Sequence, residues 1–116
     1  MKTWLVAITL PLALPAAVLA HHGWSGYDES KPLTVTGIII ESGYEHPHGF
    51  VKLDAEGKKW LVVLAPPPRM ERNGLPREQL KPGTKATVLG YQNRSDAGEM
   101  RAEHITIGTK TTQLRR

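Results

Sequence analysis

The chain has 116 residues, a formal net charge of +4 and no cysteine, so its length suits one small domain. Without cysteine it has no disulfide framework and no thiol nucleophile, and a lipid anchor on cysteine is not expected. The small excess of positive charge is scattered along the chain, which argues against a nucleic-acid-binding protein.

Residues 1–20 have the pattern of a secretion signal. Lys2 supplies a short positive start, residues 4–19 are apolar apart from one threonine, and small residues precede a cleavage point after Ala20. Two prolines interrupt the apolar run, which is too short for a stable membrane anchor of about 20 apolar residues. We therefore expect a cleaved signal peptide, a periplasmic protein and a mature chain that starts at His21.

The mature chain reads as an irregular arm followed by strands. In the arm, residues 21–32, Trp24 and Tyr27 are placed to dock onto the domain. The domain is expected at residues 33–108 and a flexible tail at residues 109–116. Alternating and β-branched residues predict five strands, at residues 33–42, 50–54, 59–64, 85–91 and 100–107.

Only one part of the chain favours helix. Three prolines at residues 66–68 end the third strand, and proline is tolerated in a first helical turn. Short helical segments are therefore expected at residues 68–73 and 76–80. Five strands with a short helical segment between the third and fourth predict an all-β, OB-like barrel.

The strand pattern also predicts the interior of the barrel. Gly37, inside the first strand, is expected to mark a bulge or a sharp coil of the strand. The residues expected to fill the interior are Val35, Ile38, Ile40, Val51, Leu53, Trp60, Val62, Leu64, Val88 and Ile105.

Four of the five histidines fall into two short clusters, His21-His22 and His46-Pro47-His48. Copper(II) favours nitrogen ligands, and a histidine at a free N-terminus offers both its amine and its ring. We therefore predict a copper site in which His21 supplies amine and imidazole and His48 a second imidazole. His22 is an alternative ligand and His46 an additional one.

A second interpretation gives the histidines a structural role. His46 and His48 would then only build a rigid turn, and the protein would be an interaction module for a periplasmic protein partner. Met70, Leu75 and the prolines at 66–68 are the contact residues expected for it. Motifs for nucleophilic or metal-dependent catalysis are missing from the sequence, so an enzyme is not expected, and an oxidative copper enzyme is the third and most distant interpretation.

Several short motifs follow one another along the chain. They are His21-His22-Gly23-Trp24-Ser25-Gly26-Tyr27-Asp28, Thr36-Gly37, Glu45-His46-Pro47-His48-Gly49, Lys59-Trp60, Arg72-Asn73-Gly74-Leu75, Lys81-Pro82-Gly83 and Val88-Leu89-Gly90. This combination resembles a family of small exported bacterial proteins classed as a domain of unknown function. The resemblance implies export and the predicted fold, and it implies no activity. The chain departs from the family pattern at two places. His46 stands where the family usually has asparagine, and Gly108-Thr109-Lys110 stands where many members have Asp-Gly-Arg.

Overall fold

The computed structural model describes residue 3 and residues 23–116, so most of the predicted signal peptide, together with His21 and His22, lies outside the described residues. Over that part of the chain, no helix is long and apolar enough to cross a membrane. The elements are η1 (Gly23–Gly26), β1 (Leu33–Gly43), β2 (Phe50–Ala55), β3 (Lys58–Val63), α2 (Pro67–Arg72), η2 (Arg77–Leu80), β4 (Lys85–Gln92), β5 (Glu99–Ile107) and β6 (Lys110–Gln113).

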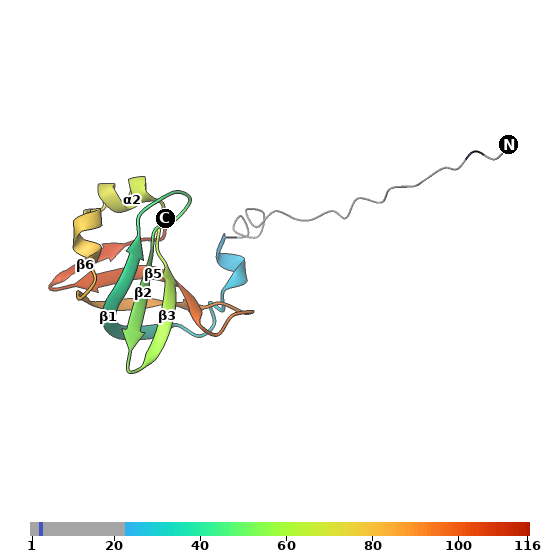
Figure 1. The fold of residues 1–116 in the computed structure, drawn as a ribbon, viewed down its shortest axis with the longest axis horizontal. Coiled ribbons are helices and arrows are strands. Elements are labelled where there is room, and N and C mark those ends of the chain that lie inside the picture. Colours follow the sequence, from blue (N-terminus) through green and yellow to red (C-terminus); the bar gives the residue numbers. More distant parts are fainter. Residues whose placement is uncertain (1–2, 4–22) are drawn as a thin grey trace.

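The first five strands form a closed barrel (Figure 1). β1 pairs with both β2 and β4, β5 pairs with β4, and a parallel contact between β3 and β5 closes the barrel. This strand order, with α2 and η2 between β3 and β4, is that of an OB fold. The predicted all-β, five-stranded barrel is therefore confirmed.

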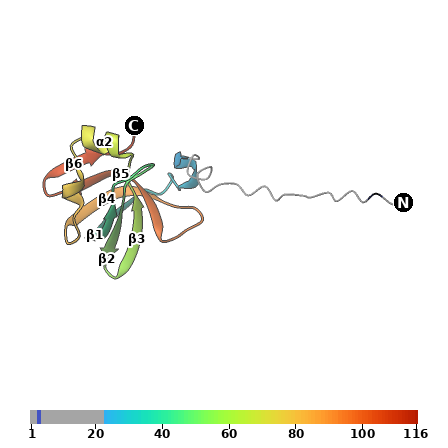
Figure 2. The ribbon, with the colours of Figure 1, turned by 45° about the horizontal axis from the view of Figure 1, so that its top comes forward.

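The barrel interior holds most of the residues that the alternation predicted. Met70, Leu75 and Leu80, from the segment between β3 and β4, are also buried, and α2 covers one end of the barrel (Figures 1 and 2). Val35 is only partly buried and packs against this core. The predicted residues that are buried are Val51, Leu53, Trp60, Val62, Leu64, Val88 and Ile105.

The prediction for β1 was wrong in its alternation. Ile38 and Ile40 are 42% and 41% exposed, whereas Ile39 is fully buried. The pairing of β1 with β4 runs regularly through Gly37. The bulge lies in the pairing of β1 with β2, directly after Ile39. Gly37 has another reason to be glycine, because a Cβ there would collide with the backbone carbonyl of Asp54.

The predicted flexible tail at residues 109–116 is also wrong, because β6 pairs with the second half of β5. Within β5, β3 pairs only with residues 99–101, which would leave the later edge of β5 with unpaired backbone groups. Gly108, with a φ of 62°, makes the turn that brings β6 back onto this edge. Leu114 then enters the core and is 1% exposed.

This tail is therefore expected to contribute to stability. Replacement of Leu114 by alanine leaves a cavity in the core and should lower the free energy of unfolding by about 2 to 5 kcal/mol. Urea denaturation followed by circular dichroism measures this loss. Gln113→Ala is the matched control, because Gln113 is exposed and its change should stay within about 0.5 kcal/mol. Equal stability of the two variants would contradict an ordered tail.

Candidate functional site

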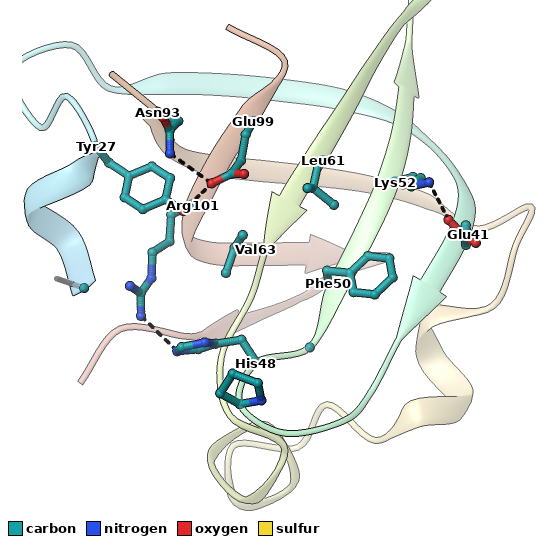
Figure 3. Close-up of a pocket in the computed structure, with 13 residues that line it drawn as sticks. Tyr27, Glu41, His48, Phe50, Lys52, Leu61, Val63, Asn93, Glu99 and Arg101 are labelled. Carbon is teal, nitrogen blue, oxygen red and sulfur yellow. Dashed lines mark hydrogen bonds and ion pairs between the residues drawn. The ribbon is translucent and has the colours of Figure 1, made fainter. Parts of the chain in front are cut away.

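A groove of about 750 Å³ runs over the outer face of the barrel, across β2, β3 and the beginning of β5 (Figure 3). Residues 47–49 of the β1–β2 loop border it on one side. Asn93, from the loop between β4 and β5, borders it together with Gly23 and Tyr27 of the N-terminal arm. In OB folds this strand face and these two loops form the ligand-binding surface, so the groove is the candidate functional site.

Strand register arranges the groove residues in two rows, because paired residues of neighbouring strands point to the same side of a sheet. The apolar residues in these rows are half-buried and form the floor of the groove, while charged residues stand at its ends (Figure 3). At one end Lys52 Nζ lies 2.9 Å from Glu41 Oε2. The first row contains Phe50, Val63 and Arg101, and the second contains Glu41, Lys52, Leu61 and Glu99.

Trp24 packs the N-terminal arm against the other end of the groove, where Arg101 lies. Its ring centroid lies 4.4 Å from the guanidinium carbon of Arg101 and 4.3 Å from that of Arg115, which are favourable cation–π distances. The ring also meets Tyr91 edge-on, at 5.9 Å between centroids. The predicted docking of the arm through Trp24 and Tyr27 is therefore confirmed, and Figure 2 shows η1 beside the barrel.

Tyr27 ties the arm to the β4–β5 loop. It forms a backbone bridge with Asn93, and its hydroxyl donates a hydrogen bond of 2.6 Å to Glu99 Oε2. The Asn93 amide donates to the same carboxylate oxygen at 3.0 Å. Burial, and then the hydrogen bond to Glu99, raise the pKa of Tyr27 to about 12. The phenol is therefore a neutral donor near pH 7, and it holds Glu99 on the arm side of the groove.

Arg101 is the most unusual group in the groove. The residue is only 8% exposed, its Nε is buried without a hydrogen-bond partner, and one of its terminal nitrogens lies 3.4 Å from His48 Nε2. Among the ion pairs of the described residues, none involves Arg101. Burial lowers the pKa of its guanidinium, yet arginine stays charged in proteins. A buried cation without a counter-charge therefore borders the groove.

His48 connects this groove to a smaller pocket of about 420 Å³, which His46 and Arg77 also line. Burial is the main reason why the pKa of His48 is lowered from 6.5, and the positive charges of Arg101 and Arg69 lower it further. The ring is therefore neutral near pH 7. It can accept a hydrogen bond from Arg101 or offer a lone pair to a metal.

The predicted metal ligands are only partly brought together. His46 and His48 border the same small pocket, while His21 and His22 lie outside the described residues. Across residue 3 and residues 23–116, no group of three or more His, Asp or Glu side chains could hold a metal ion. The four-histidine copper site therefore stays a prediction.

Sequence reasoning missed Arg101 as a groove residue. Two of the expected contact residues, Met70 and Leu75, are 0% and 1% exposed and belong to the core, because α2 and the segment after it close the end of the barrel. The expected contact prolines at 66–68 are half-buried or exposed. One signal for Arg101 was available, since this charge stands between the apolar Met100 and Ala102 in a strand.

The lowered pKa of His48 gives a pH dependence with a definite sign. As pH falls below about 6.5, the unfolded chain takes up a proton at His48 more readily than the folded protein, so the folded state should lose stability. His48→Gln should reduce this loss, as measured by urea midpoints from pH 7 downward. The imidazole signals of His48 in NMR should titrate below 6.5. His46→Gln is the matched control, and titration of His48 at or above 6.5 would contradict its buried, cationic surroundings.

Solved structures share the fold at low sequence identity. The chain is similar to a ZRD-deleted mutant of TiaS in complex with agmatine, with a TM-score of 0.55, 17% identity, and coverage of 75% of this chain and 27% of that one. It is also similar to TiaS in complex with tRNA and ATP, with a TM-score of 0.51, 20% identity, and coverage of 77% of this chain and 20% of that one. The chain thus spans about a quarter or less of these structures, and the likeness concerns the fold alone.

Sequence comparison identifies a family without an assigned activity. No curated protein matches the chain in sequence. The model of DUF6152, a family of unknown function, matches residues 10–101, which is most of the chain. This small β-barrel protein therefore belongs to the DUF6152 family.

Proposed function

We propose that this protein is a non-catalytic periplasmic binding module whose groove over β2, β3 and β5 docks a protein partner. The observation that carries the proposal is the half-exposed apolar floor of Phe50, Leu61 and Val63 between two charged ends. A volume of about 750 Å³ is in the range of ligand-binding pockets, and it suffices for a few side chains of a partner. The sequence pattern of residues 1–20 supports the export that the proposal includes.

The charges of the groove favour a protein over a nucleic acid. A TiaS structure contains tRNA, but single-stranded nucleic acids need a positive groove and several stacking rings. Here Phe50 supplies one aromatic ring on the floor, and the acidic Glu41 and Glu99 stand at opposite ends. A phosphate backbone along the groove would meet both carboxylates.

The groove also suits binding better than turnover. His48 faces Arg101 instead of the hydroxyl that nucleophilic catalysis would pair with it. Glu99 accepts hydrogen bonds from Tyr27 and Asn93, which occupies one of its oxygens. These polar groups give shape and charge to a binding surface.

Site-specific photo-crosslinking in the exporting cell tests the groove directly. A photoreactive phenylalanine derivative at Leu61, on the groove floor, should crosslink a periplasmic protein in a defined complex. The same group at Lys85, which is exposed on β4 away from the groove, is the control and should give no such complex. The complex should persist when a metal chelator is present, because contact area and not a metal holds it. Crosslinks of equal yield from both positions, or none from Leu61, would exclude the groove as the docking surface.

Copper binding is the second candidate, and one observation favours it. Gly23 lines the groove that also contains His48. If the mature chain starts at His21, its terminal amine belongs to the residue two positions before Gly23, so chain geometry limits their Cα separation to about 7 Å. The amine and ring of His21, the neutral ring of His48 and either His22 or His46 would then supply nitrogen ligands of the kind that copper(II) prefers.

Calorimetric titration with copper(II) tests this candidate on exported protein whose start at His21 has been verified by mass spectrometry. The combined His21→Ala and His48→Ala changes should weaken binding at least about tenfold, because each removes a nitrogen ligand. A Gly-Ser-Gly-Ser extension before His21 should weaken it similarly, while the His104→Ala control should not. Unchanged affinity in the double variant, or affinity no better than that of a peptide of residues 21–28, would rule out the site.

A further inference from the structure

Arg101 has no counter-charge although it is almost fully buried. Its 8% exposure and the partnerless Nε mean that most of the water around the guanidinium has been removed. Buried charges in proteins are normally paired, because removing a charge from water is unfavourable. The guanidinium lies over the face of Trp24 and 3.4 Å from the ring of His48, and both groups are neutral near pH 7. A negative charge is therefore missing beside Arg101.

The other charges around Arg101 add to this positive field. Arg69 and Arg115 are close enough to lower the pKa of Arg101 further, whereas Tyr27 opposes them. Glu99 lies in the neighbouring row of the groove, but it is held by Tyr27 and Asn93 and makes no ion pair with Arg101. Glu99 therefore repels an anion from the arm side of the groove and leaves the side near His48 open to it.

The balance of charges favours a carboxylate over a phosphate. One planar guanidinium matches the two oxygens of a carboxylate, in a bidentate pair. A doubly charged phosphate would call for a second free cation in the lining of the groove. Lys52 lines it but is already paired with Glu41, and neither Arg69 nor Arg115 lines it. Two acids, Glu41 and Glu99, also line the groove and disfavour a dianion.

The apolar floor begins directly beside Arg101. Val63 is the residue paired with Arg101 across β3 and β5, and Phe50 follows Val63 in the same row. Gly43 leaves room for the Phe50 ring, because a Cβ there would collide with it. A ligand whose carboxylate meets Arg101 would therefore lay an apolar group on Val63, Phe50 and Leu61 (Figure 3).

We propose that the Arg101 end of the groove binds the free C-terminal carboxylate of the partner chain, and that the apolar floor binds that chain's last side chain. This inference rests on the proposed function, in which the groove docks a protein. A chain terminus combines one carboxylate with an adjacent apolar side chain, and its capture is a recurring mode of peptide recognition. The two terminal nitrogens of Arg101 are the donors assigned to the carboxylate, because its Nε has almost no exposed surface.

Peptide titration of the mature protein, followed by calorimetry and NMR, tests the inference. The probe is an acetylated Gly-Ser-Gly-Leu-Val peptide with a free acid, compared with the same peptide as its C-terminal amide. The acid should bind at least about tenfold more tightly, since it alone forms a charge-assisted pair. Binding should shift the Nε–H signal of Arg101, the ring signals of His48 and the methyl signals of Leu61 and Val63. Equal affinity of acid and amide, or shifts outside the groove, would overturn the inference.

Variants test whether the guanidinium of Arg101 binds the carboxylate. Arg101→Lys keeps a charge but loses the fork geometry, and it should reduce acid binding about tenfold, while Arg72→Gln, at an exposed position on α2, should leave it unchanged. If Arg101→Lys does not fold, the acid and amide comparison on the unaltered protein still decides. Acid binding by folded Arg101→Lys at unaltered affinity would contradict the assigned role.

Two further probes separate the sources of the anion. Octanoate or inorganic phosphate that binds at Arg101 while the free-acid peptide does not would overturn the C-terminal carboxylate as occupant. Failure of the peptide while Leu61 still crosslinks a partner would overturn this inference and leave the proposed function in place. Peptide binding at Arg101 without any crosslink from Leu61 in the cell would support the carboxylate site and count against the proposed protein partner.

Discussion

The parallel pairing of β3 with the first residues of β5 is the constraint on which the rest of the molecule depends. It closes the barrel and brings Val63 beside Arg101 and Leu61 beside Glu99, which sets the two rows of the groove in register. Because this pairing stops at Arg101, the later part of β5 keeps a free edge, and β6 fills it. One short ladder therefore decides both where the candidate site lies and why the C-terminal segment is ordered.

The N-terminal arm changes the character of this groove. On the bare outer face of β5, the side chain of Arg101 would be solvated, as surface arginines usually are. Trp24 lies over the guanidinium, and Tyr27 holds the arm against the β4–β5 loop and Glu99. An ordinary surface cation thereby becomes a desolvated one, and desolvation strengthens its attraction for any anion that enters the groove.

The charge of Arg101 favours one of the two proposed ligands, a carboxylate, over the other, a copper ion. Two unit charges 4 Å apart interact by about 4 kcal/mol at the effective dielectric constant near a protein surface. A carboxylate at Arg101 gains an attraction of this kind, whereas a copper ion on His48 Nε2 would meet repulsion from a guanidinium 3.4 Å away from that atom. Copper binding at His48 Nε2 therefore requires Arg101 to move away from that atom. This electrostatic difference is why we prefer binding of a protein partner to binding of copper as the proposed function.

The sequence by itself determined the first five strands, the short helical segment after three prolines, and the docking residues of the arm. Alternation, proline geometry and the presence of aromatic residues in a polar arm are local properties. It also determined that His46 and His48 lie together. Only the tertiary structure decided that Ile39 points inward instead of Ile38 and Ile40, that β6 forms, and that Arg101 is a buried cation in a groove. Each of these depends on which distant strand lies alongside. Gly37 illustrates the difference. The sequence marks this glycine as unusual within a strand, but only the structure shows why the position needs glycine: the backbone of Asp54 passes too close for a side chain.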